Sequence, residues 1–260
     1  MNKVTTLFSS SSGNSALISD GNTNILVDAG VSSARIIKAL SDINMDICEI
    51  DAILVTHEHT DHIKGIGILS RNYNIPVYTN SSTMSAMLYQ IGDLHDRNIR
   101  VVECAKQFEV RDVAITPFAI PHDAVSPMGY KICTDYGILS IATDTGHITK
   151  SMLSNMAKSD TVLIEANHDV DMLTNGKYPY PLKKRILSDN GHLSNQNAAW
   201  LATQLAMWGT KKIILGHLSE HNNTEQKAYD AAKQLLEQNK IKVGSDVLLK
   251  VASKNSICQI

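Results

Sequence analysis

The sequence has few cysteines, little net charge and no long hydrophobic run. Its four cysteines are scattered and include no C-x-x-C pair, so they indicate reduced thiols and not a disulfide framework. The formal net charge is −2, which excludes a global positive field that would attract nucleic acid or anionic lipid. Any such attraction has to come from local basic clusters.

No apolar segment approaches the ~20 residues that a membrane-spanning helix requires. Residues 1–15 hold one lysine and then a serine-rich stretch, without the apolar run of a signal peptide. We therefore expect a cytoplasmic enzyme with no membrane contact. The hydrophobic content of 43% is ordinary for a globular protein, and no linker interrupts the chain after the early serines. We predict one domain over residues 1–260.

The densest chemical signal is the stretch Thr56–His62, which directly follows an apolar run. It places four possible metal ligands within six residues: His57, His59, Asp61 and His62. If the chain stays extended, His57 and His59 point the same way and hold one ion together. Asp61 and His62 then face a second ion, roughly 3.5–4 Å from the first in two-metal hydrolases. A histidine-rich polar turn is the simpler alternative.

Further polar residues lie just past runs predicted as strands. His122 and Asp144 each follow such a run, at the strand ends where layered α/β proteins tend to build sites. Asp28 also ends an apolar run, and it either orients a metal-binding histidine or occupies a plain turn. The serine-rich turn at residues 9–14 forms either a small anion nest or a plain loop.

The C-terminal half adds two histidines and a basic segment. His217 follows the strand predicted over Lys212–Leu215, and His192 directly precedes a predicted helix. Residues 177–185 carry the densest positive charge of the chain. We interpret them as an aromatic and basic loop that faces a nucleic-acid backbone, with a solvated helix start as the alternative.

These residues together resemble, in type and order, the five motifs of the metallo-β-lactamase superfamily: Asp28, His57-x-His59-x-Asp61-His62, His122, Asp144 and His217. The resemblance spans nearly the whole chain and implies an α/β fold, a four-layer αββα sandwich with the site at one edge of two sheets. Residues 9–14, 165–169, 191–195 and 217–223 are similar to the YycJ/WalJ group of this superfamily. The chain lacks the large inserted domain of the β-CASP nucleases.

The resemblance also implies the role of each motif residue. It divides the ligands between two metal ions: His57, His59 and His122 at one, Asp61, His62 and His217 at the other, and Asp144 bridging both. A carboxylate at position 144 favours two-metal hydrolases over the lactam-cleaving branch. The YycJ/WalJ group implies a 5′-to-3′ exonuclease that acts on double-stranded DNA. Zinc suits a histidine-rich site and manganese suits phosphate chemistry, so Zn²⁺ and Mn²⁺ both stay open.

We expect the two ions to activate water for attack on a phosphodiester. Asp61 either ligates the second ion or helps to deprotonate that water. His192 is predicted to bind the scissile phosphate or to protonate the leaving oxygen, and a helix-capping histidine is the alternative. The remaining predicted substrate contacts, which would meet phosphate or sugar, are Asn14, Asn167, Lys183 and Arg185.

Two other functions use the same ligands. A small-molecule hydrolase, either a glyoxalase II-like thioesterase or a cyclic-nucleotide phosphodiesterase, needs no different metal site. The protein could also be a non-enzymatic regulator that binds metal only to stabilise its fold. A ligand set for two ions disfavours this function, because structural zinc normally has a closed four-ligand shell. The oligomeric state has no signature in the sequence.

Overall fold

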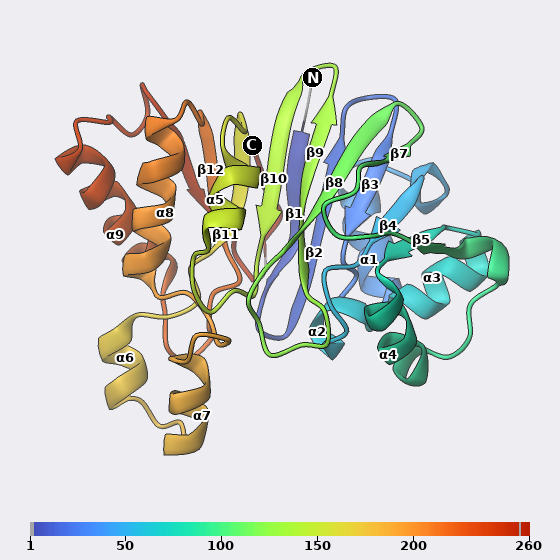
Figure 1. The fold of residues 1–260 in the computed structure, drawn as a ribbon, viewed down its shortest axis with the longest axis horizontal. Helices are drawn as coiled ribbons and strands as arrows, with labels where there is room; N and C mark the ends of the chain where they lie inside the picture. Colours follow the sequence, from blue (N-terminus) through green and yellow to red (C-terminus); the bar gives the residue numbers. More distant parts are fainter. Residues whose placement is uncertain (1–2, 255) are drawn as a thin grey trace.

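Two seven-stranded sheets form the centre of the protein in a computed structural model that describes residues 3–254 and 256–260 (Figure 1). Residues 1, 2 and 255 of the predicted domain lie outside the described residues. The first sheet has the strand order β14-β1-β2-β3-β4-β5-β6. Its strands are β1 Lys3–Ser10, β2 Gly13–Ser19, β3 Asn24–Val27, β4 Ala52–Leu54, β5 Val77–Thr79, β6 Ile99–Val101 and β14 Cys258–Gln259.

The second sheet has the order β13-β12-β11-β10-β9-β8-β7. Its strands are β7 Phe108–Val110, β8 Val113–Ala119, β9 Met128–Thr134, β10 Gly137–Ala142, β11 Thr161–Glu165, β12 Lys212–Gly216 and β13 Leu248–Val251. Each sheet has an antiparallel part and a parallel run, which comprises β3 to β6 in the first sheet and β10 to β13 in the second. The carboxyl ends of each parallel run therefore lie at one edge of its sheet.

Helices cover the outer face of both sheets. Those over the first sheet are α1 Ser33–Asp42, α3 Ile66–Tyr73 and α4 Ser81–Ile91, and those over the second are α5 Lys150–Met156, α8 Asn195–Met207 and α9 Glu225–Gln238. The shorter helices are α2 Thr60–Ile63, α6 Val170–Asn175, α7 Tyr180–Ile186 and the 3₁₀ turns Ile47–Glu49 and Asp96–Asn98. The predicted four-layer αββα fold is confirmed.

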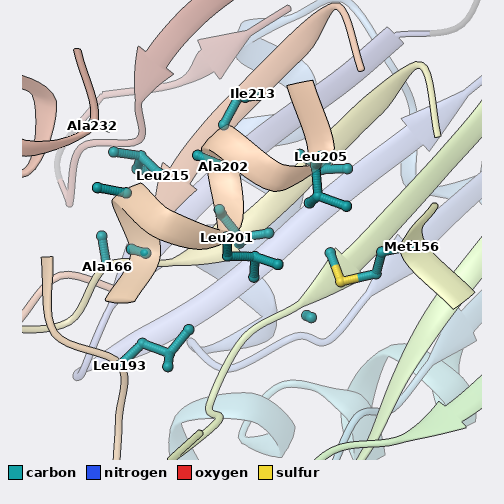
Figure 2. Packing of buried hydrophobic residues seen from close by; sticks show 14 of the residues in the cluster. Met156, Ala166, Leu193, Leu201, Ala202, Leu205, Ile213, Leu215 and Ala232 are labelled. Carbon is teal, nitrogen blue, oxygen red and sulfur yellow. The ribbon is translucent and has the colours of Figure 1, made fainter. Parts of the chain in front are cut away.

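Alternation along the strands produces these layers. In β12, Ile213 and Leu215 pack against the helices while Ile214 faces the other sheet. In β4, Ile53 faces the helices and Leu54 faces the space between the sheets. Because successive strand residues point to opposite faces, a strand that is covered on both sides must be apolar throughout. Leu201 and Leu205 of α8 lie over β12 and fill the outer core of the second sheet (Figure 2).

Two segments differ from the sequence-based expectation. The sequence from Ile63 to Arg71 predicts one helix, whereas the structure has two, α2 and α3. Because α2 begins at Thr60, Asp61 and His62 lie in a helix. The predicted basic loop is instead largely helical, as the alternative of a helix start has it. Helix α7 begins at Tyr180 with Pro181 in its first turn, where proline needs no amide hydrogen. Among residues 3–254 and 256–260, no helix has the length and apolar character needed to span a bilayer.

Candidate functional site

Loops from both sheets converge at one edge of the sandwich. They follow β3, β4, β8, β10 and β12 and carry Asp28, residues 57–62, His122, Asp144 and His217. Asp28, Asp144 and His217 have left-handed backbone conformations, with φ of 61°, 58° and 56°. Each such conformation costs a non-glycine residue on the order of 1–3 kcal/mol and is concentrated at functional sites. Three of these loops therefore hold a strained backbone at a residue that contributes to the cluster.

The first group of candidate ligands is His57, His59 and His122. One ring nitrogen of each lies within 4.8 Å of the others, and His122 Nε2 lies 3.3 Å from His59 Nδ1. His122 Nδ1 lies 3.0 Å from the carbonyl oxygen of Gly191. A carbonyl only accepts hydrogen bonds, so Nδ1 carries the proton and Nε2 keeps a lone pair for a metal ion.

The second group is Asp61, His62 and His217. The Asp61 Oδ2 atom lies 3.5 Å from His62 Nε2 and 3.6 Å from His217 Nε2. Asp144 lies between the two groups, because its carboxylate oxygens are 3.1 Å from His62 Nε2, 3.3 Å from His217 Nε2 and 3.8 Å from His122 Nε2. One carboxylate thus faces ligands of both groups, as a bridging ligand would.

Asp28 holds the His62 ring from behind. Its Oδ2 atom lies 2.7 Å from His62 Nδ1. The carboxylate is itself fixed because it accepts hydrogen bonds from the Thr56 amide and hydroxyl, both at 2.8 Å. Metal-binding histidines are commonly oriented by a carboxylate on the nitrogen that faces away from the metal. The predicted orienting role of Asp28 therefore has the geometry that it needs.

Glu165 is a site residue that the sequence motifs did not reveal. Its Oε1 atom lies 2.7 Å from both His217 Nδ1 and His192 Nδ1. Its Oε2 atom accepts from the amides of Thr145 and Leu193, both at 3.0 Å. With both oxygens occupied, this buried carboxylate orients two imidazoles and does not act as a ligand. The sequence signal that could have revealed Glu165 is its position at the end of β11, a strand with no other charged residue.

The cluster fits a divalent metal ion. His57 Nε2, His217 Nε2 and Asp144 Oδ2 are buried and form no hydrogen bond within residues 3–254 and 256–260. Leaving one buried polar atom unsatisfied costs about 1–3 kcal/mol. Imidazole nitrogen and carboxylate oxygen are suitable ligands for zinc, and carboxylate also for manganese. Divalent cations bound to the two groups would satisfy these atoms.

The carboxylates give the cluster a strongly negative potential. Burial disfavours a charged His217, but the surrounding carboxylates of Asp144, Asp61 and Glu165 outweigh it and raise the pKa of His217 to about 10. Burial also disfavours a charged His62, yet Asp144 and Asp28 raise the pKa of that ring well above its usual value. The field that attracts these protons also attracts a metal cation, which has to displace them in order to bind.

A cavity of about 290 Å³ opens onto the cluster. Its lining includes His192 and four candidate ligands, namely His59, Asp61, Asp144 and His217. Residues 170–186, here called the α6–α7 arm, supply another part of the lining and project beyond the strand ends (Figure 1). A cavity of about 320 Å³ beside Ser9 and Lys254 contains none of the candidate ligands.

Two predicted substrate contacts lie against the ligands. Asn14 Nδ2 lies 3.3 Å from Asp61 Oδ2 and 3.1 Å from His62 Nε2, so this amide contacts candidate ligands, where a substrate contact was predicted. Asn167 lines the cavity, and its amide also donates to the His217 carbonyl oxygen at 3.1 Å. Asn167 can therefore meet a substrate, while Asn14 lies beside the metal-binding groups.

The two predicted cationic contacts have different positions. Arg185 lines the cavity, and its Nε atom donates to the Asp123 carboxylate. Lys183 instead donates from Nζ to the Thr174 carbonyl oxygen at 2.7 Å, at the end of α6. The structure thus places Arg185 at the site and gives Lys183 a contact within the arm.

Known sequences include relatives that match most of this chain. Residues 23–218 match the family described as "Beta-lactamase superfamily domain". The chain is 40% identical over 246 residues to "Exodeoxyribonuclease WalJ" of Streptococcus pneumoniae, covering 94% of this chain and 91% of that protein. It is 37% identical over 238 residues to "Exodeoxyribonuclease YycJ" of Bacillus anthracis, covering 92% and 90%.

Solved structures share the fold at much lower identity. The metallo-β-lactamase fold protein YhfI from Bacillus subtilis superposes with a TM-score of 0.73 at 17% identity, covering 99% of each chain. Human tRNase Z, short form, superposes with a TM-score of 0.67 at 14% identity, covering 98% of each chain. These similarities support the architecture.

The orienting role of Asp28 predicts that Asp28→Asn lowers the affinity for a divalent ion by about 10- to 100-fold. Asparagine tolerates the left-handed backbone, so the substitution removes the charge and keeps the conformation. Calorimetric titration of the metal-free protein with Zn²⁺ measures the effect. Asp42→Asn, at an exposed residue paired with Lys38, is the control. Equal affinities of Asp28→Asn and the control would contradict the role.

Proposed function

Because the chain belongs to the metallo-β-lactamase superfamily, we propose that it is a metal-dependent exonuclease that degrades double-stranded DNA in the 5′-to-3′ direction. The observation that carries the proposal is the cluster of imidazole and carboxylate ligands at a cavity of about 290 Å³. Pockets for small ligands measure about 300–1,000 Å³, so this cavity suits one terminal nucleotide better than a long duplex. The relatives at 37–40% identity are named exodeoxyribonucleases.

We assign the candidate ligands to two divalent ions, Zn²⁺ or Mn²⁺. One ion would be held by His57, His59 and His122, the other by Asp61, His62 and His217, with Asp144 shared between them. When bound, such ions polarise a phosphoryl oxygen and make water nucleophilic at neutral pH. Asp61 is a ligand in this assignment, because its Oδ2 atom faces the Nε2 atoms of both histidines in its group.

We infer that His192 delivers a proton to the leaving oxygen. Its Nδ1 atom is bound to Glu165 Oε1 at 2.7 Å, which leaves Nε2 as the donor on a ring that lines the cavity. The buried carboxylate stabilises the protonated ring. The helix-capping alternative does not fit, since Ser194 caps α8 and its Oγ atom accepts from the Asn197 amide.

We infer that Arg185 is the cation that contacts the substrate backbone. Its guanidinium lines the cavity, and hydrogen bonding to Asp123 raises its pKa, so it stays charged. The Asp123 Oδ1 atom lies 3.3 Å from His122 Nε2, which puts this ion pair beside the candidate metal ligands. A phosphate entering the cavity would compete with Asp123 for the guanidinium.

The activity is tested with a substrate panel on metal-loaded protein. The panel holds 5′-phosphorylated duplex DNA, single-stranded DNA, RNA, a bis-aryl phosphodiester and a thioester. We expect the duplex to be degraded fastest and to release nucleotides from its 5′ end, with activity lost on chelation. Thioester turnover without any nuclease activity, across several salt and metal conditions, would refute the proposal and favour a small-molecule hydrolase.

We expect His192→Ala to lower kcat by about 10²- to 10⁴-fold, the usual contribution of a general acid. The metal content should not change, because Glu165 keeps its bonds to His217 and to two amides. Mass spectrometry of the metal and single-turnover kinetics separate the two effects. His95→Ala, at an exposed residue, is the control. Normal turnover at full metal occupancy would remove His192 from the reaction.

Arg185→Gln and Lys183→Gln form a matched pair one helical turn or less apart. We expect Arg185→Gln to raise the KM for DNA and to reduce the slope of binding affinity against salt by about 1, as for one lost phosphate contact. Lys183→Gln should leave both unchanged, since Lys183 is bound to Thr174 within the arm. Equal effects of the two substitutions would argue for a diffuse positive surface.

A further inference from the structure

The α6–α7 arm contributes a part of the catalytic cavity whose chemistry differs from the rest. Among the described residues that line the cavity, the apolar side chains are Tyr178, Leu182 and Ile186, and all three come from the arm. The other lining side chains are ionisable, hydroxyl or amide groups. One cavity therefore joins a metal-binding, charged region to an apolar region supplied by a single segment.

We propose that Tyr178 is the platform on which the base of the terminal nucleotide stacks, with Leu182 and Ile186 beside it. This inference rests on the proposed exonuclease function and names the part of the substrate that the arm recognises. The phosphate of a nucleotide is drawn to cationic groups, whereas the faces of its base are apolar and aromatic. A cavity with both surfaces matches both ends of one nucleotide.

The Tyr178 ring is held in place from outside the arm. It meets the ring of His221 edge to face, with centroids 5.9 Å apart and an interplanar angle of 79°. His221 is exposed and belongs to the loop after β12, which also carries His217 and Ser219. An aromatic contact of this geometry restrains the Tyr178 ring. The platform is thus tied to the same loop that supplies a candidate metal ligand.

Stacking suits an enzyme that removes every nucleotide in turn. All four bases present an aromatic face, so a tyrosine accepts each of them without reading the sequence. The neighbouring Leu182 and Ile186 offer no hydrogen-bonding groups that would favour one base edge over another. The alternative explanation for Tyr178 is that it only packs the arm against His221. In that case the affinity for DNA would not depend on whether the terminal nucleotide carries a base.

The test compares Tyr178→Ala, Tyr178→Phe and Tyr180→Ala in metal-loaded protein. Tyr180 lies on the same arm, is 77% exposed and does not line the cavity, so it is a matched control. Loss of one base stack corresponds to a KM about 5- to 150-fold higher for a 5′-phosphorylated duplex. We expect that increase for Tyr178→Ala alone, with Tyr178→Phe and Tyr180→Ala close to the wild type.

A duplex whose 5′-terminal nucleotide lacks its base separates recognition from folding. The wild type should lose affinity for the abasic end by the same factor, whereas Tyr178→Ala should bind abasic and normal ends equally. The platform would be overturned if the wild type and Tyr178→Ala lost the same affinity on the abasic end. It would also be overturned if the wild type bound abasic and normal ends equally.

Binding of products tests the same point without turnover. Calorimetry with dAMP and with 2-deoxyribose 5-phosphate should show tighter binding of dAMP by the wild type and no difference for Tyr178→Ala. If the protein degrades no DNA but still prefers dAMP, the proposed function fails and the base platform stands. If it degrades DNA but does not prefer dAMP, the platform fails and the exonuclease stands.

Discussion

The geometry of the site depends on two buried carboxylates, Asp28 and Glu165, that accept hydrogen bonds from the Nδ1 atoms of imidazole rings. Each carboxylate lies 2.7 Å from the Nδ1 atom of a candidate ligand, His62 or His217, and has further donors of its own. A histidine fixed at Nδ1 has only Nε2 left to offer, and here those atoms converge. Without this constraint the rings could rotate, and the negative cluster would have no defined place for a cation.

The same arrangement occurs once in each sheet. Asp28 follows β3 and holds His62, which follows the parallel neighbour β4. Glu165 ends β11 and holds His217, which follows the parallel neighbour β12. Adjacent parallel strands bring their carboxyl ends to one edge, so a carboxylate from one strand reaches the ring from the next. The centre therefore requires both sheets, with Asp144 after β10 joining the two halves.

The parts that sequence could predict are those in which local chemistry decides the structure. Short apolar runs located the strands, and the spacing of His57, His59, Asp61 and His62 indicated a metal site. Glu165 escaped because an acidic residue at a strand end looks like any surface carboxylate until tertiary packing buries it. The helix α7 was predicted only as the alternative to a loop, because Pro179, Pro181 and three cations obscure its apolar side. Lys183 and Arg185 looked equivalent, because the sequence does not show that Lys183 donates a hydrogen bond to a backbone carbonyl group of the arm.

These positions bear on how the protein selects a substrate. With a net charge of −2, it has no global attraction for a duplex. Of the two cations predicted to contact the substrate, Arg185 is paired with Asp123 and Lys183 is bound to Thr174, so neither offers an unpaired charge to an extended backbone. Long duplex tracts would then be bound weakly at physiological salt. Selectivity has to come from short-range contacts within the cavity, and a cavity of about 290 Å³ can make them only with a chain end. The physical properties of the site favour recognition of a terminus over recognition of the double helix.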